Sequence, residues 1–195
     1  MSHQFAKIMF TDGVKATQSD FGSREKQERF SQLAGPNDSL GELEAGFIAA
    51  RDTFYMATVN EAGWPYVQHR GGPVGFLRVL DARWLAYADF RGNTQLVSMG
   101  NSRGNDRVSL ILMDYPNRRR LKVLGHLRYE QAERASAKDL EAVALPGYRA
   151  RIERIVYIDV VAFDWNCPQH IARRFTEQEF AAFKSGINSK RGSAL

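Results

Sequence analysis

The sequence predicts a mainly β protein of the α+β class, an antiparallel barrel flanked by helices. Six or seven segments between residues 53 and 163 are rich in β-branched and aromatic residues, and several alternate in polarity, as strands do. Short connections of turn-forming residues join most of these segments, so neighbouring strands are expected to run antiparallel. Six or seven antiparallel strands leave the fewest unpaired backbone groups at their edges when the sheet closes into a barrel.

The composition is that of an ordinary globular chain of one domain with an extension. It has 195 residues, of which 44% are hydrophobic. The single cysteine, Cys167, excludes an intramolecular disulfide and an all-cysteine metal site. Residues 1–7 lack the apolar core of a signal peptide, and no apolar run is long enough to span a membrane. We therefore expect a cytoplasmic protein with no membrane contact.

Residues 1–38 are predicted to form an N-terminal helical extension, and residues 39–195 the main domain with a C-terminal loop and helix. The stretch 18–32 mixes many charges with a few large apolar residues, which is typical of an amphipathic surface helix. Ser39 followed by Glu42 predicts a capped helix that runs to about residue 51. Both Glu42 and Glu44 are expected to face solvent.

The predicted elements of the main domain follow in chain order. Strands are expected at residues 54–59, 64–70, 76–80, 84–89, 107–113, 119–129 and 152–163. Helical spacing begins at residue 96, a polar loop is expected at 100–105, and a helix is expected at 137–145. Thr176 and Glu179 predict the capped start of a final helix that reaches about residue 184.

The segment 89–95, Asp-Phe-Arg-Gly-Asn-Thr-Gln, is the first candidate site. It lies between a buried strand and the start of a helix, so it offers free backbone N–H groups and the positive end of a helix dipole. Arg91 and the polar side chains beside it favour an anion, of which phosphate suits best. The alternative from the local sequence is a solvated polar turn.

Several motifs occur in an order that resembles the pyridoxamine 5′-phosphate oxidase-like family of flavin-binding split β-barrels. The resemblance spans about residues 54–129, with a further match at 166–171. It rests on the segments Gly63-Trp64-Pro65-Tyr66-Val67-Gln68-His69-Arg70-Gly71-Gly72-Pro73, Tyr87-Ala88-Asp89-Phe90-Arg91-Gly92-Asn93, Asn105-Asp106-Arg107-Val108-Ser109-Leu110, Met113-Asp114-Tyr115-Pro116 and Arg119-Arg120-Leu121-Lys122-Val123-Leu124-Gly125.

The resemblance implies a homodimer with flavin mononucleotide (FMN) at the subunit interface. The cofactor-binding residues that it implies are Gln68, His69, Arg70, Gly71, Gly72, Arg91, Gly92, Asn93, Thr94, Gln95, Arg120 and Lys122. It also implies an active-site loop that closes over the flavin and contains Asn166, Cys167, Gln169 and His170. A Cys167–His170 nucleophile pair is the alternative use of that loop.

The sequence departs in two places from the vitamin B6 enzyme of this family, which oxidises pyridoxine phosphate. The basic pair of the phosphate turn is replaced by Asn93 and Thr94, so Arg91 or Arg70 must supply the charge. The Arg- and His-bearing substrate motif near the C-terminus of that enzyme is not evident. Pyridoxine phosphate is therefore not the expected substrate.

The predicted function is that of an FMN-dependent oxidoreductase acting on an unidentified small substrate, with no catalytic acid or base evident. One alternative is a binding module that holds FMN, heme or a deazaflavin without turnover. A nucleic-acid protein is another, because the net charge is +5 and residues 118–120 are all arginine. We do not expect it, since those arginines fall where the family places a flavin contact. The four histidines show no metal-ligand spacing.

Overall fold

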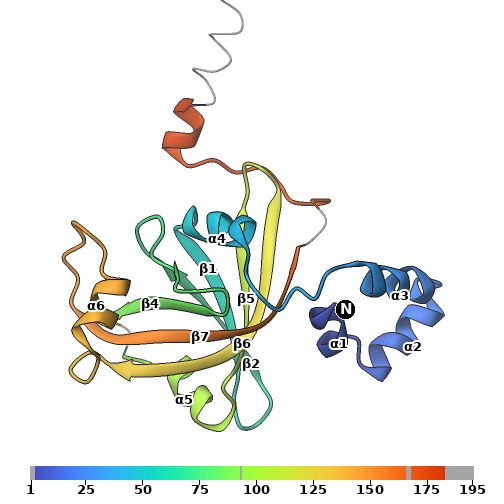
Figure 1. Ribbon diagram of the computed structural model, residues 1–195, viewed down its shortest axis with the longest axis horizontal. Helices are drawn as coiled ribbons and strands as arrows, with labels where there is room; N and C mark the ends of the chain where they lie inside the picture. The colour runs from blue at the N-terminus through green and yellow to red at the C-terminus, as the bar shows by residue number, and fades with distance from the viewer. Residues whose placement is uncertain (1–2, 93, 166–167, 183–195) are drawn as a thin grey trace, which may run out of the picture.

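The computed structural model describes residues 3–92, 94–165 and 168–182, and its centre is a curled antiparallel sheet. The strands of this described part are ordered β2-β1-β5-β6-β7-β4-β3. Figure 1 shows the long strands β6 and β7 sweeping around the core, which confirms the predicted α+β class. The strands are β1 Thr53–Val59, β2 Pro65–Gly71, β3 Arg78–Val79, β4 Trp84–Phe90, β5 Arg107–Asp114, β6 Arg119–Gln131 and β7 Ile152–Trp165.

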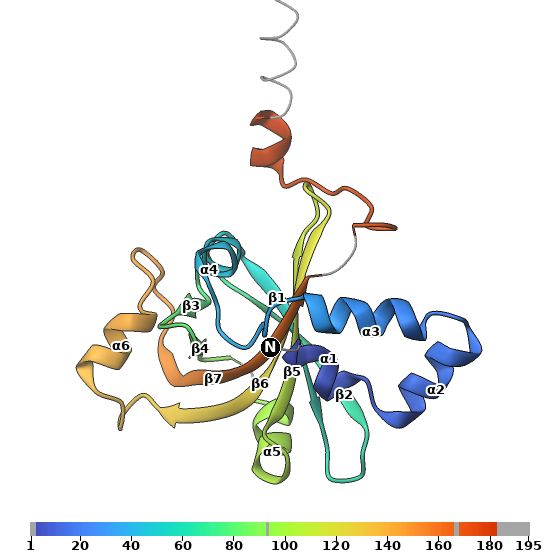
Figure 2. The ribbon, with the colours of Figure 1, turned by 45° about the vertical axis from the view of Figure 1, so that its right-hand side comes forward.

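Helices surround this sheet on several sides. They are α1 Gln4–Met9, α2 Asp12–Asp20, α3 Arg24–Leu33, α4 Glu42–Ala49, α5 Val97–Gly104 and α6 Ala137–Val143. In Figure 2, α2 and α3 stand to one side of the barrel, while α4 and α5 lie toward opposite ends. Within the described residues, no helix is both long and apolar enough to cross a bilayer. The proposed domain boundary at residue 38 stays a prediction.

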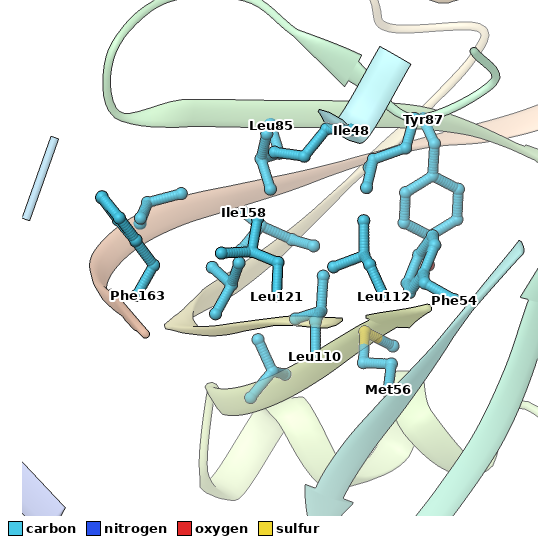
Figure 3. Close-up of a cluster of buried hydrophobic side chains, with 14 of the residues drawn as sticks. Ile48, Phe54, Met56, Leu85, Tyr87, Leu110, Leu112, Leu121, Ile158 and Phe163 are labelled. Atoms are coloured by element: carbon cyan, nitrogen blue, oxygen red, sulfur yellow. The ribbon is translucent and has the colours of Figure 1, made fainter. Parts of the chain in front are cut away.

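The core lies inside the curl of the sheet. Inward positions alternate along the strands, so β5 buries Leu110 and Leu112 while β1 buries Phe54 and Met56. Figure 3 shows these side chains meeting Leu121 and others from the facing strands. Burying each large apolar side chain contributes about 1.5–3 kcal/mol, so this cluster fixes how the strands curl.

The start of α4 differs from the sequence prediction. The helix begins at Glu42, and Gly41 rather than Ser39 is its N-cap. Leu40 is buried and its N–H donates to a carbonyl of the β3–β4 turn at 2.7 Å, which holds residues 39–40 outside the helix. The Ser39 hydroxyl donates to Asp38 instead, at 3.3 Å.

Glu44 was expected in solvent, and that prediction was wrong. Its carboxylate accepts hydrogen bonds from Gly41 N at 3.0 Å and from Trp165 Nε1 at 2.8 Å. The Trp165 ring packs edge-on against Phe47, and the Arg119 guanidinium lies 4.7 Å above it. Because Glu44 receives two N–H donors, a carboxylate is tolerated in a buried position that joins α4 to the end of β7.

Two further elements differ from expectation. The stretch predicted as one helix is two, because the chain turns at Gly22, whose φ is +66°. The expected polar loop at 100–105 mostly belongs to α5, in which buried Asn101 donates to Thr58 Oγ1 at 2.9 Å.

The predicted helix cap near the C-terminus is confirmed. Thr176 N donates to Glu179 Oε2 at 2.8 Å, and Glu179 N donates back to Thr176 Oγ1.

Candidate functional site

A cleft of about 290 Å³ lies where the edge strand β2 approaches β4. These two strands are not hydrogen-bonded neighbours, so the cleft sits in the seam that the curled sheet leaves open. Its lining residues are Gln68, His69, Arg70, Gly71, Phe76, Tyr87, Ala88, Asp89, Phe90 and Tyr148. The fold therefore brings together two segments that are about twenty residues apart in the sequence and that sequence analysis had singled out separately.

Arg70 and Asp89 form an ion pair across this seam. Arg70 Nη1 lies 3.6 Å from Asp89 Oδ1, and their side chains are only 10% and 12% exposed. Arg70 faces inward because it is paired with Phe54, a core residue of β1. Asp89 also accepts a hydrogen bond from Arg154 Nε at 2.8 Å, so one buried carboxylate serves two guanidinium groups.

Buried donors with no partner in the described part of the chain lie in and around this ion pair. The hydroxyls of Tyr87 and Tyr129 and Arg70 Nε are buried without a hydrogen-bond partner among the described residues. Burial raises the pKa of Tyr87 above its usual range and raises that of Tyr129 to about 12, so both phenols stay protonated near neutral pH. Unpaired buried donors of this kind are suited to a polar ligand or ordered water.

The β4–α5 turn begins directly after Phe90, which lines the rim of the cleft. Arg91 is 71% exposed, and its Nε lies 3.9 Å from a carboxylate oxygen of Glu153. No side chain caps the N-terminus of α5, where Leu96 has a φ of +53°. Ser98 Oγ in the first turn of α5 donates to Gln68 Oε1 at 3.1 Å, which ties the helix start to β2. The positive end of α5 thus lies beside Gln68, a residue that lines the cleft.

The sequence profile of the family described as Pyridoxamine 5′-phosphate oxidase matches residues 41–159, more than half of the chain. The chain belongs to this pyridoxamine 5′-phosphate oxidase family. The matched span contains the β2–β4 cleft and the whole β4–α5 turn, whereas α1, α2 and α3 precede it. Among curated protein sequences, none matches the chain significantly.

Solved structures confirm the split-barrel fold. HupZ from Group A Streptococcus is 14% identical, with a TM-score of 0.52 over 70% of this chain and 99% of that one. An FMN-binding protein from Syntrophomonas wolfei subsp. wolfei is 10% identical, with a TM-score of 0.50 over 77% of this chain and 97% of that one. At these identities the likeness establishes the fold of this family member and not its activity.

Not every predicted cofactor residue of this family member lies in the cleft. Arg120 and Lys122 alternate with the buried Leu121 of β6, so they lie on the outer face of the sheet. Lys122 Nζ is 3.4 Å from Asp164 and 4.8 Å from the Phe5 ring centre. The predicted set is therefore divided between the two faces of the sheet.

Of the remaining predicted residues in the β2 segment and the turn, some border the cleft and others are exposed outside it. The His69 imidazole borders the cleft but is engaged by Thr53, with 2.6 Å between Nε2 and Oγ1. Gly72 donates its N–H to Asp52 O at 3.0 Å and contributes no side chain. Gly92, Thr94 and Gln95 are exposed on the turn, and Asn93 lies outside the described residues.

The C-terminal segment does not border the cleft. Asn166 and Cys167 lie outside the described residues, while Gln169 and His170 are exposed and line none of it. Residues 174–179 instead border a groove of about 670 Å³ beside the β5–β6 turn, where the Arg174 guanidinium lies 5.0 Å from the Tyr115 ring centre. The role of this segment as an active-site loop stays a prediction.

Sequence reasoning missed Glu153, Arg154 and Tyr129, which all contact or face the seam. The available signal was the charged pair Glu153-Arg154 just before the apolar run that starts at Ile155, which is unusual for a buried strand. The face that each of them occupies depends on how β7 pairs with β4 and β6, which no local pattern reveals. Within the described ranges, no group of His, Cys, Asp and Glu side chains is arranged to hold a metal ion.

Proposed function

We propose that this chain is an FMN-dependent oxidoreductase that acts on an unidentified small substrate. The single observation that carries the proposal is the β2–β4 cleft, which brings the β2 segment and the end of β4 together. The N-terminus of α5 lies beside it, because Ser98 donates to the cleft-lining Gln68. An FMN-binding protein with the same fold supports the choice of cofactor. The departures at Asn93 and Thr94 speak against pyridoxine phosphate as the substrate.

The chemistry of the donor set fits a flavin nucleotide. Arg91 and the uncapped start of α5 suit a phosphate dianion at the rim. Inside the cleft, the unpaired Tyr87 hydroxyl and Arg70 Nε can donate to polar groups of the ligand. Phe90 and Tyr148, whose ring centres are 5.0 Å apart, offer an apolar wall that excludes water.

The flavin supplies the redox chemistry when it is bound, and the protein binds, orients and tunes it. Arg70 places a fixed positive charge in the seam, partly balanced by Asp89. Tyr87 remains a neutral donor because its burial disfavours the phenolate. Among the cleft-lining residues no general acid or base stands out, so the proposed role of these residues is to position the reacting ring.

The same proposal includes a homodimer with flavin at the interface. The outer face of the sheet carries a second hollow of about 410 Å³. Its lining is mainly apolar and comprises Ile8, Met9, Ala57, Val59, Arg107, Val108, Ser109, Leu124, Gly125, His126 and Val161. A second copy on this face would cover the apolar surface.

Sedimentation tests the dimer. The unaltered chain of 22.1 kDa should sediment as a dimer, and Leu124→Glu should shift it toward the monomer because a carboxylate enters the apolar face. Leu43→Glu, at an exposed leucine of α4 that does not line the hollow, is the matched control and should leave the mass unchanged. A monomeric wild-type protein would remove the interface from the proposal.

The visible absorbance spectrum of the purified protein, before and after addition of FMN, tests the cofactor. Flavin bands that stay with the protein through gel filtration support the proposal, and reduction of that flavin by a nicotinamide or photochemical donor supports an enzyme. Bound flavin without any reduction would indicate a binding module. A heme band, or no chromophore even after FMN is added, would contradict the assignment of FMN.

A further inference from the structure

A β-bulge in β7 lies directly beside the β4–α5 turn. In the β4–β7 register, Asp89 is paired with Arg154 and Phe90 with Ile152, so Glu153 is the extra residue. Bulges leave one residue outside the ladder and redirect its side chain, often beside a functional site. Here the bulge lets two successive residues, Glu153 and Arg154, both contact charged partners near the seam.

These contacts form a chain of five alternating charges, Arg70, Asp89, Arg154, Glu153 and Arg91. The successive distances are 3.6 Å, 2.8 Å, 3.2 Å and 3.9 Å. The chain begins at the buried ion pair in the seam and ends at the exposed arginine on the rim. It therefore connects the two arginines that sequence analysis assigned to the flavin phosphate.

Arg154 is the central member of this ion-pair chain. Its Nε donates to Asp89, while its terminal nitrogen lies 3.2 Å from Glu153, so one planar guanidinium joins two carboxylates. Burial alone would lower the pKa of Arg154, but the hydrogen bond and charge of Asp89 raise it above its ordinary value. A lysine carries a single point of charge and cannot reproduce this bridge.

Glu153 faces one edge of the Arg91 guanidinium at an ion-pair distance of 3.9 Å. The contact uses Arg91 Nε, which leaves the two terminal nitrogens of Arg91 with no protein partner among the described residues. Those two nitrogens form the fork that binds phosphate oxygens in a bidentate manner. The backbone is fixed as well, since Arg91 N donates to Arg151 O at 2.9 Å. The Glu153 carboxylate thus favours one orientation of the guanidinium before an anion arrives.

We propose that Glu153 and Arg154 are positioning residues that orient Arg91 for the phosphate monoester of the ligand. The inference rests on the proposed function, because it takes FMN as that phosphate-bearing ligand. Neither residue binds the ligand itself. Three arginines and two carboxylates leave the ion-pair chain with one net positive charge, which suits an anion at its exposed end.

The experiment compares FMN with riboflavin, which lacks the phosphate, on the full-length chain. Glu153→Ala should weaken FMN binding about 3- to 10-fold, because Arg91 loses its preorganisation, and should leave riboflavin binding unchanged. Arg154→Lys should act in the same direction. Glu153→Gln keeps the shape and an acceptor, so it should have an intermediate effect and guards against misfolding.

Glu133→Ala is the matched control. Glu133 is an exposed glutamate near the turn that pairs with Arg151 and not with Arg91, so its loss removes the same charge without releasing the fork. If general charge alone mattered, both alanine variants would strengthen FMN binding. The proposal predicts unchanged or slightly tighter binding for Glu133→Ala and weaker binding for Glu153→Ala.

The outcomes distinguish the positioning role of Glu153 and Arg154 from the proposed FMN-dependent function. If the unaltered chain binds FMN and Glu153→Ala binds it equally well or more tightly, the positioning role is overturned while the proposed function stands. If FMN and riboflavin both weaken to the same extent, the role is structural and the inference also falls. If the unaltered chain does not bind FMN at all, the proposed function and this inference fail together.

Discussion

Arg70 of β2 and Asp89 of β4 meet 3.6 Å apart across a seam where no backbone hydrogen bond joins the two strands. The edges of the split barrel are therefore held together by charge beside the candidate site. Asp89 also accepts from Arg154, so its carboxylate compensates two buried guanidinium groups at once. Removing one partner of a buried ion pair lowers the free energy of unfolding by more than the intact pair contributes to it. The reason is that the remaining charge stays buried without a counter-charge.

Asp89→Asn should destabilise the protein by about 3–5 kcal/mol, since Arg70 and Arg154 lose their shared counter-charge. Urea unfolding followed by tryptophan fluorescence measures this change. Asp106→Asn is the matched control, because Asp106 pairs with His126 at an exposed position and should cost less than about 1 kcal/mol. Equal effects of the two substitutions would show that the seam ion pair does not stabilise the barrel.

Gly125→Ala should destabilise the barrel by about 1–3 kcal/mol. Gly125 lies at the register shift between β6 and β7, where an added Cβ would be 2.5 Å from Asp159 O and 2.8 Å from Ile158 Cγ2. Thermal unfolding tests this, with Gly100→Ala as control. Gly100 faces open space in α5, so its replacement should leave stability unchanged or raise it. An unchanged unfolding temperature in Gly125→Ala would contradict this prediction, because it would mean that β6 and β7 can move apart to accommodate the Cβ.

Acidification should release α1 before the barrel unfolds. His3 Nδ1 accepts from Ala6 N at 3.2 Å and caps α1, a role that a protonated ring cannot perform. Burial lowers the pKa of His3 below 6.5, partly offset by the Asp164 charge, so the unfolded arm takes up the proton first. This contribution to stability is present above pH 6.5 and is lost as pH falls below it.

Limited proteolysis at Lys7 measures this release, with faster cleavage expected at pH 5 than at pH 7.5. His3→Asn supplies a neutral N-cap and should remove most of the pH dependence. An identical pH dependence in that variant would assign the effect to other groups.

Alkaline conditions should also destabilise the protein through Tyr129. Burial raises its pKa to about 12, whereas the unfolded phenol ionises near 10. The folded state holds the proton more tightly, so this contribution to stability is present below pH 10 and is lost as pH rises toward 12. Unfolding midpoints between pH 9 and 12 should fall less steeply for Tyr129→Phe than for wild type, and parallel curves would contradict the assignment.

The sequence was sufficient for the fold class because strand alternation and short turns are local features. It also predicted the β4–α5 turn, since an apolar run, a glycine and a helix start follow one another there. It failed at Ser39, where the buried backbone bond of Leu40 decides the start of α4. Such a contact comes from a segment forty residues away and leaves no local trace.

The candidate site was only half accessible to sequence reasoning. Arg70 was found through its motif, but its partner Asp89 was noted only as part of the turn, because the seam joins strands that are not paired. Glu153 depends on a bulge, which shifts the phase of β7 by one residue and cannot be located without the register. Lys122, which the family resemblance places with the cofactor residues, lies on the outer face of the sheet, and its role as a flavin contact stays a prediction.

Titration of FMN into the unaltered protein and into Arg91→Ala tests the central claim most directly. The exposed Arg91 fork should contribute charged hydrogen bonds to the phosphate, so the substitution is expected to weaken binding about 10- to 100-fold. Arg103→Ala, which removes an exposed arginine from α5, is the matched control and should change affinity little. Equal FMN affinity in the Arg91→Ala variant and the wild type, or no FMN binding by either, would contradict the account.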